Sequence, residues 1–405
     1  MANQPLSIPS KQNRKAKSLH RRTFVTALAV CSTILLPFLR SVAESAHERA
    51  PSTGLISRRA IVFNAAVNKV YAVDPENNAV SIISGDAHSL RSVKVGARPL
   101  AIAVNPTTDR VYVANTIGGT VSVLDGTSDA VLATVNVGAR PYVLAVNPIE
   151  NKVYVSNTFS DVLTIIDGKT NTISRVKTGS ADAINVDPKR NRVYLLGYES
   201  SSLTVLDGAD SSLSKLPAGA MHLWSMVMDE ASATLYVTRI GNADVVAIDT
   251  HTHALTPVGT GQLPCAIAAN EKTRLLYVAN CGDDSVSVID ETKRVTAKTI
   301  HVGSHPQAIA VDAKNNLIYV ANTHGNSMTV IDGSRNEVVA TLPAGTNPYA
   351  VALDASTGAI FVANLGEPSF TRIDRPRVSN KSSPYEATPV ESSKLPFEQA
   401  VLHSR

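Results

Sequence analysis

The stretch VYVANTIGGTVSVLDGTSDAVLATVNVGARPYVLAVNP, residues Val111–Pro148, recurs along the chain with small changes. Closely similar stretches begin at Arg274 and at Asn316. When the copies are aligned on the aromatic residue of VYVAN, successive anchors lie 40 to 42 residues apart. The anchors are Tyr71, Tyr112, Tyr154, Tyr194, Tyr236, Tyr277, Tyr319 and Phe361. A fixed period of this length indicates one small unit that is copied and stacked.

Each copy holds four short runs rich in Val, Ile, Tyr and Thr, which are the residues that strands prefer. In the second copy these runs are LAIAVNP, VYVAN, TVSVLDG and LATVNVG. Asn-Pro and Asp-Gly pairs punctuate the runs and favour tight turns. No run has a convincing helical period, and several are apolar at nearly every position, as expected where both faces are covered. The sequence predicts an all-β protein, a β-propeller of four-stranded antiparallel blades.

The number of blades follows from counting the runs. The first three runs occur eight times, whereas the fourth is evident only seven times, ending with VVATLPAG. We therefore predict eight blades, the last one closed by a segment near residues 52–56 or by part of the tail. Seven blades with a ragged end is the alternative.

The copies YVANTIGGTVSVLDG, YVANCGDDSVSVIDE and YVANTHGNSMTVIDG resemble the repeat of the YVTN-type, YncE-like β-propellers, found in exported bacterial proteins and archaeal surface-layer proteins. The resemblance covers residues 58 to 376. The first, fourth and fifth copies depart from the motif. The resemblance implies the propeller fold and leaves the function open.

The two ends of the chain differ from the repeats. Residues 1–46 have a basic leader, an apolar run from Phe24 to Leu39 and the small residues Ser41-Val42-Ala43, which is the form of an export signal. His20–Phe24, HRRTF, resembles the twin-arginine export motif. We predict cleavage near Ala43 with no stable membrane span afterwards, and a periplasmic or secreted location, with an uncleaved anchor as the alternative. Residues 47–57 are then a linker or closing segment, 58–376 the propeller and 377–405 a mobile tail.

The bulk composition limits the classes of binding partner to be expected. The chain of 405 residues is 44% hydrophobic and carries a net charge of +4, with its cations spread over the repeats. Charge therefore does not demand a nucleic-acid partner. The partner expected is a small molecule or protein at the mouth of the central channel, where the loops before each first run and after each VYVAN run meet.

Residues that recur in every blade at this mouth suit a structural role better than a binding role. Asn115, Asn157, Asn280, Asn322 and Asn364 share one position and are interpreted as turn formers that bond their own backbone. Gly96, Gly138, Gly179, Gly219, Gly303 and Gly345 share another and serve backbone turns.

Departures from the repeat identify candidate ligand-binding residues. They are Arg98, Arg140, Tyr198, Glu199, His222, Trp224 and Arg239. Trp224 is the only tryptophan of the chain, and Arg239 replaces the recurrent Asn. A cluster of arginine, aromatic and histidine side chains suits an anionic or planar ligand. Drift in tolerant loops, with Trp224 filling a wedge between sheets, is the alternative.

Two further candidate sites lie in the sixth and seventh copies. His305 and His324 flank the open end of one strand pair, near Asp283 and Asp284, and this residue set suits a divalent metal. Solvated loop residues are the alternative, and no cofactor is otherwise predicted. Cys265 and Cys281 are equidistant from the turn near Thr273 and should oppose each other, which predicts a disulfide in an oxidising compartment. Two buried thiols are the alternative.

The function predicted from these features is a binding or interaction scaffold. The sequence lacks the CxxCH motif of haem attachment, a glycine-rich phosphate loop and the GxSxG turn. An enzyme is therefore less favoured, although a propeller lyase or hydrolase with a metal or His/Glu site stays open. A structural repeat protein of the cell envelope is the third possibility.

Overall fold

The computed structural model describes residues 60–84, 90–158, 160–354, 357–365, 370–374 and 393–394. The chain divides into two units, Met1–Ile56 and Ser57–Arg405, and every described residue belongs to the second. The predicted export signal lies outside the described residues.

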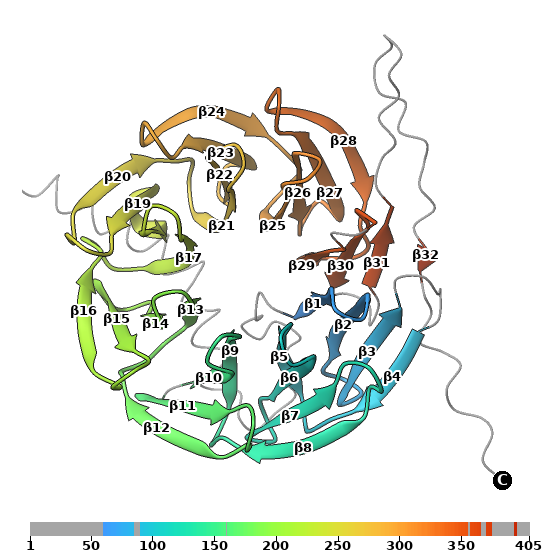
Figure 1. Ribbon diagram of the computed structural model, residues 1–405. Helices are drawn as coiled ribbons and strands as arrows, with labels where there is room; N and C mark the ends of the chain where they lie inside the picture. The colour runs from blue at the N-terminus through green and yellow to red at the C-terminus, as the bar shows by residue number, and fades with distance from the viewer. Residues whose placement is uncertain are drawn as a thin grey trace, which may run out of the picture. The chain divides into compact units, whose positions relative to one another are not determined.

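Eight four-stranded antiparallel sheets are arranged in a ring (Figure 1). The prediction of an eight-bladed propeller is confirmed, and the seven-bladed alternative is wrong. Blades 1 to 4 comprise β1(Ile61–Asn64), β2(Lys69–Asp74), β3(Ala79–Ser84), β4(Leu90–Lys94), β5(Pro99–Asn105), β6(Arg110–Asn115), β7(Thr120–Asp125), β8(Val131–Asn136), β9(Pro141–Asn147), β10(Lys152–Asn157), β11(Val162–Asp167), β12(Ile173–Lys177), β13(Ala183–Asp187), β14(Arg192–Leu196), β15(Ser202–Asp207) and β16(Leu213–Pro217). Blades 5 to 8 comprise β17(Leu223–Asp229), β18(Thr234–Arg239), β19(Asp244–Asp249), β20(Leu255–Gly259), β21(Pro264–Asn270), β22(Leu275–Asn280), β23(Ser285–Asp290), β24(Val295–His301), β25(Pro306–Asp312), β26(Leu317–Asn322), β27(Ser327–Asp332), β28(Glu337–Pro343), β29(Pro348–Leu353), β30(Ile360–Asn364), β31(Phe370–Ile373) and β32(Ser393–Lys394). Within the described part of the chain, the only helical element is a 3-10 turn, η1(Ile240–Asn242).

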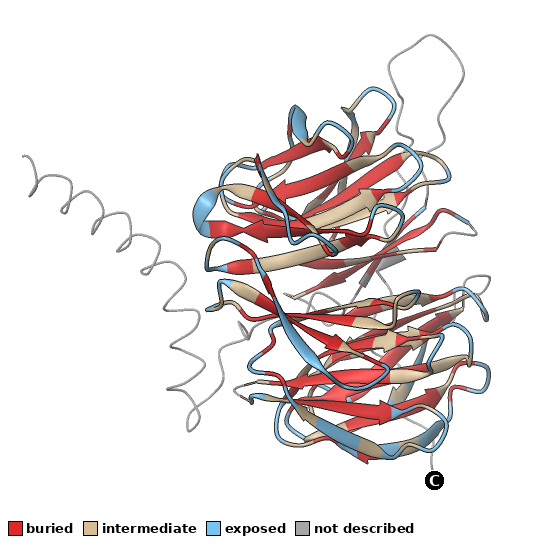
Figure 2. Ribbon diagram, turned by 60° about the vertical axis from the view of Figure 1, so that its left-hand side comes forward, coloured by how far each residue is buried: buried red, intermediate tan, exposed pale blue. Residues whose placement is uncertain are grey.

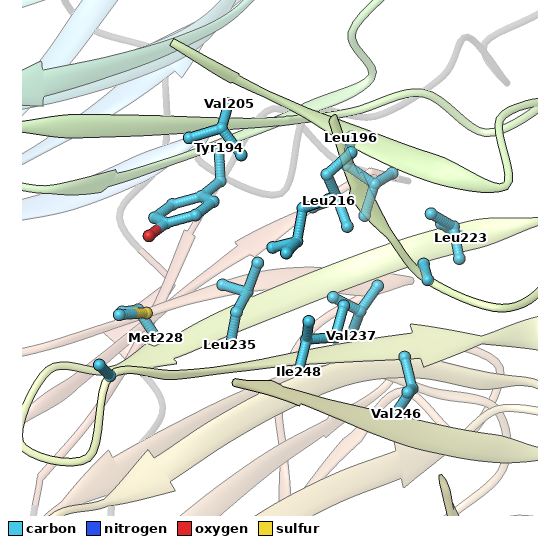
Figure 3. Close-up of a cluster of buried hydrophobic side chains, with 13 residues drawn as sticks. Tyr194, Leu196, Val205, Leu216, Leu223, Met228, Leu235, Val237, Val246 and Ile248 are labelled. Carbon is cyan, nitrogen blue, oxygen red and sulfur yellow. The ribbon is translucent and has the colours of Figure 1, made fainter. Parts of the chain in front are cut away.

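The core lies between neighbouring blades. Tyr194 of blade 4 and Leu235 of blade 5 belong to one buried cluster, shown in Figure 3. Each blade is covered by its neighbours, so its second and third strands are buried on both faces. The fourth strand, which lies at the outside of the ring, is largely exposed (Figure 2). Replacing a buried leucine such as Leu235 with alanine would cost about 2–5 kcal/mol.

On the face opposite the channel mouth, hydrogen bonds join one blade to the next. The last residue of an innermost strand donates its side-chain amide to the residue that closes the first hairpin of the following blade. Asn105 donates to Asn151 Oδ1 (2.8 Å), Asn147 to Asn191 Oδ1 (3.0 Å) and Asn270 to Asn316 Oδ1 (2.8 Å). The acceptors lie in the left-handed region, which Asn adopts readily.

The junction between blades 5 and 6 reverses this arrangement. Asp229 stands in the place of the donor Asn, and Arg274 of blade 6 donates from Nη1 to Asp229 Oδ2 (2.9 Å). Arg274 Nε also pairs with Glu291 Oε2 (3.1 Å). Glu291 stands at a position where most other blades have glycine. Burial raises the pKa of Glu291 to about 7, although the Arg274 charge opposes this. An ion-pair network therefore replaces the amide bond here.

The ring closes where β29 of blade 8 packs beside β1 of blade 1. The fourth strand of blade 8 is β32, whose residues Lys394 and Ser393 pair with Thr371 and Arg372 of β31. Of the two segments considered for closure, part of the tail therefore supplies the strand, and residues 52–56 lie outside the described residues. Ser393 and Lys394 lie within residues 377–405, the predicted tail, and the rest of that stretch lies outside the described residues.

Candidate binding site at the channel mouth

The loop before each innermost strand has one repeated backbone shape. Arg98, Arg140, His222 and His305 occupy the same position of this loop and have positive φ angles of 51°, 55°, 61° and 55°. Their carbonyl oxygens accept a hydrogen bond from the loop after the second strand of the same blade, for example from Thr116 N to Arg98 O at 2.9 Å. These side chains therefore share one ring of equivalent sites at the mouth.

A β-bulge follows this position in most blades. The strand register shifts at Leu100, Tyr142, Cys265, Gln307 and Tyr349, and over Trp224-Ser225 in blade 5. A bulge bends the strand and redirects a side chain, and bulges are frequent near functional sites. Of these residues, the sequence-based prediction included only Trp224 and Cys265. The recurring proline one position earlier was the available signal for the others.

The recurrent Asn residues do not act as the sequence predicted. Asn115, Asn280 and Asn322 are fully buried, and their amide groups donate across the blade to hydroxyl groups of the third strand. Asn280 Nδ2, for instance, lies 2.9 Å from Ser285 Oγ and 3.0 Å from Ser287 Oγ. Their role is structural, as predicted, but the partner is the neighbouring strand and not their own backbone.

These buried amides also explain a recurrent glycine. A Cβ atom at Gly303 would lie 2.5 Å from Asn322 Nδ2, and one at Gly96 would lie 2.6 Å from Asn115 Cγ. At these positions glycine is required by the close approach of the Asn side chain.

Arg239, predicted as a ligand-binding residue, forms part of the blade interior. Only 6% of the Arg239 residue surface is exposed to solvent. Nε donates to Asp244 Oδ1 (2.7 Å), Nη2 donates to Asp244 Oδ2, and Nη1 donates to the carbonyl of Ala218 (3.0 Å). Asp244 occupies the position of Ser285 in blade 6, so Arg239–Asp244 replaces the repeated Asn–Ser pair. The guanidinium is therefore engaged within the blade, and a ligand contact by Arg239 stays a prediction.

Three other predicted residues do come together between blades 4 and 5. The ring centroid of Tyr198 lies 5.0 Å from that of His222 and 5.8 Å from that of Trp224, the latter pair meeting edge to face. His222 N donates to Tyr198 O (2.9 Å), which ties the two loops together. Tyr198 and Trp224 are half-buried, and His222 is exposed. The rings are thus fixed in position and reachable from solvent.

An acidic residue that the sequence reasoning missed adjoins these rings. Asp182 Oδ2 accepts a hydrogen bond from Tyr198 N (2.7 Å). Asp182 is exposed, but the loops around its carboxyl partly desolvate it, and this desolvation, with a further contribution from the Glu199 charge, raises its pKa. Glu199 itself is exposed beside Tyr198. Asp182 directly precedes β13, at the position that corresponds to Tyr142 of blade 3.

Arg98 and Arg140 lie in blades 2 and 3, outside the aromatic group. Arg98 is half-buried and Arg140 is exposed. Arg98 N donates to Asn78 Oδ1 (2.7 Å), so its backbone also joins the loop to the preceding blade. Both side chains belong to the mouth, but no described contact joins them to the rings between blades 4 and 5.

The proposed metal ligands are only partly assembled. His305 and His324 stack with ring centroids 4.1 Å apart and an interplanar angle of 11°. His305 Nδ1 donates to Cys281 O (3.2 Å), and burial, followed by the nearby His324, lowers the pKa of His305. Asp284 Oδ1 accepts from His305 N (2.7 Å), and Asp283 accepts from Ser285 Oγ and Gln262 N.

The contacts already made by these side chains bear on the metal hypothesis, which stays a prediction. The carboxylates of Asp283 and Asp284 are engaged by backbone and hydroxyl donors. Among the residues that the structure describes, no group of three or more His, Cys, Asp or Glu side chains is arranged to hold a metal ion.

Cys265 and Cys281 are joined by a disulfide, with Cα atoms 6.1 Å apart. The bridge links the bulge of β21 to the loop that follows β22. Both sulfur atoms lie close to the carbonyl oxygen of Pro306 in blade 7, at 3.1 Å and 2.9 Å. In blades 2 and 7, threonine hydroxyls contact the equivalent carbonyl of the next blade. The disulfide thus occupies a repeated point of contact between blades.

The described geometry defines an eight-bladed propeller with a structural polar repeat and one aromatic, acidic corner at its mouth. The sequence profile of the YncE-like beta-propeller family matches residues 92–378, and the chain belongs to this family. No protein of curated function matches it in sequence. No helix in the described ranges has the length and hydropathy of a membrane span.

Solved structures share the fold at low identity. Dihydro-heme d1 dehydrogenase NirN in complex with DHE is 18% identical with a TM-score of 0.67, covering 79% of this chain and 73% of that chain. Kuenenia stuttgartiensis hydrazine synthase is 16% identical with a TM-score of 0.54, covering 82% and 98%. A functionally unknown protein from Desulfotomaculum acetoxidans DSM 771 is 14% identical with a TM-score of 0.56, covering 73% and 99%. These likenesses concern the fold alone.

Proposed function

We propose that the protein is an exported binding scaffold that holds its ligand or partner on the channel-mouth face. The observation that carries this proposal is the group formed by Tyr198, His222 and Trp224, which departs from the repeat, is held by inter-loop hydrogen bonds and remains accessible. Aromatic side chains that are rigid and half-exposed are typical of binding surfaces.

Structural roles account for the rest of the polar repeat, and this strengthens the assignment. The recurrent Asn residues and Arg239 are buried in bonds within the blade. The side chains that remain at the mouth include those of the aromatic group, its acidic neighbours, and Arg98 and Arg140.

The test compares variants at the mouth with one on the opposite face. Tyr198→Ala and Arg140→Ala should weaken retention of a copurifying ligand or partner, whereas Ile149→Ala, in an exposed turn of the opposite face, should not. Unfolding curves of the Arg140 and Ile149 variants should stay close to wild type, because exposed substitutions usually change stability by within about 0.5 kcal/mol, whereas Tyr198→Ala also loses the packing of a half-buried ring. Equal retention by all three would refute the mouth as the binding face.

Export rests on the leader, with its basic start, apolar run and small residues. N-terminal sequencing of the native protein should begin near Glu44 or a few residues later. Protein recovered outside the cytoplasm with an intact Met1 would contradict cleavage.

A further inference from the structure

The corner between blades 4 and 5 combines aromatic rings with two carboxylates. We call Asp182, Tyr198, Glu199, His222 and Trp224 the aromatic–acidic corner. Tyr198 connects its parts, because its ring contacts those of His222 and Trp224 while its backbone N–H holds Asp182 Oδ2 at 2.7 Å. Glu199 follows Tyr198 in the same loop. The rings and the acidic groups therefore share one small region.

The negative charge of this corner is not balanced from within. Arg239 lies in the same blade as Trp224, but its guanidinium is engaged by Asp244 and Ala218 O. The pKa of Asp182 is raised by desolvation and by Glu199, and no positive group among the described residues counteracts this. Arg140 lies at the mouth of blade 3, one blade away.

Tyrosine and tryptophan rings carry partial negative charge on their faces and attract cations placed over them. The planes of Tyr198 and Trp224 make an angle of 79°, so the two rings present faces in different directions. An organic cation with an apolar shell gains contact with such faces and charge attraction from nearby carboxylates. An anion at the same place would be repelled by Asp182 and Glu199.

We propose that the aromatic–acidic corner binds a small organic ammonium ion. The inference rests on the proposed function of the mouth and adds the chemical class of its ligand. Trp224 and Tyr198 contact the apolar shell of the cation, and Asp182 and Glu199 supply the opposite charge. Protonation of Asp182 removes its charge and opposes binding, so affinity increases as pH rises through the titration of this carboxyl.

The experiment is a titration with choline, followed by the fluorescence of Trp224, which is the only tryptophan of the chain. The comparison ligand is 3,3-dimethyl-1-butanol, which has the same shape without the charge. An open corner of this kind should bind choline with a dissociation constant of about 1 mM. The neutral analogue should bind at least about tenfold more weakly, because it lacks the attraction to the carboxylates and ring faces.

Variants separate the carboxylates from general surface charge. Asp182→Asn and Glu199→Gln should each weaken choline binding by about 3- to 10-fold. Glu150→Gln is the matched control, because Glu150 is an exposed acid in the first hairpin turn of blade 3, on the opposite face. It should leave the dissociation constant unchanged.

Three results would overturn the inference. Choline could leave the fluorescence unchanged up to about 10 mM, the neutral analogue could bind equally well, or both carboxylate variants could bind as wild type. The cation inference fails while the proposed function of the mouth stands if an anion, pivalate or phosphate, binds instead and Arg98→Gln or Arg140→Gln abolishes this binding. If neither these arginine variants nor Tyr198→Ala changes the binding of any ligand or partner, the proposed function fails as well.

Discussion

Arg239 and Asp244 allow a direct test of whether the departure from the repeat in blade 5 is structural. Their side chains are 7% and 13% exposed, and they form the ion pair that stands where blade 6 has Asn280 and Ser285. Removing one partner of a buried pair leaves the other charge without compensation and costs about 3–5 kcal/mol. We expect this loss in the free energy of unfolding of Asp244→Ser.

The double variant Arg239→Asn/Asp244→Ser rebuilds the pair of blade 6 and should recover most of that loss. One bond remains missing, because Val246 stands where Ser287 accepts the second amide hydrogen in blade 6. One hydrogen bond contributes about 1 kcal/mol, so the double variant should lie about 1 kcal/mol below wild type. The second substitution should therefore recover about 2–4 kcal/mol of the loss caused by Asp244→Ser.

Urea unfolding followed by Trp224 fluorescence and by circular dichroism provides the measurement, since coincident curves and equal slopes justify comparing the free energies. Asp161→Ser is the matched control, because Asp161 pairs with Lys177 at the surface with exposed fractions of 54% and 80%. It should cost less than about 1 kcal/mol. The reasoning is refuted if Asp244→Ser costs no more than this control, or if the double variant is as unstable as the single one.

The remaining predictions concern pH, glycine and the disulfide. Because the pKa of Glu291 is about 7 in the folded chain against an ordinary 4.5, folding binds a proton between these values, and stability falls as pH rises from about 4.5 to about 7, by up to ~3 kcal/mol. Glu291→Gln should remove this contribution, so its unfolding free energies at pH 5 and pH 8.5 should differ less than those of wild type, and an unchanged difference would contradict it. Gly303→Ala should destabilise by about 2 kcal/mol through the approach to Asn322 Nδ2, whereas Gly259→Ala, with open space around its Cβ, should be nearly neutral by thermal unfolding; equal effects would show that the buried amide adapts. Alkylation of the denatured, unreduced protein followed by peptide mass spectrometry should leave Cys265 and Cys281 unmodified, and modification of both would rule out the bridge.

The amino-acid sequence by itself determined the architecture. The period of 40 to 42 residues and the four turn-bounded runs of each copy specify a ring of four-stranded blades, because such a sheet needs neighbours on both faces. Cys265 and Cys281 are placed symmetrically about one turn, so the sequence also predicted that these two residues, 16 positions apart, lie opposite each other. In both cases the interacting positions belong to one hairpin or to another copy of the same repeat.

Only the tertiary structure decided what the mouth residues contact. Arg239 and His222 both lie next to loops of blade 5, yet Arg239 is buried on Asp244 and His222 is exposed against Tyr198. Sequence could not distinguish them, because burial depends on strand register and on a bulge at Trp224 that no pattern announces. Tyr198 and Trp224 belong to different blades and meet only when the ring assembles. Asp182 was overlooked for the same reason, since its partner is defined by the loop of Tyr198 folding back over it.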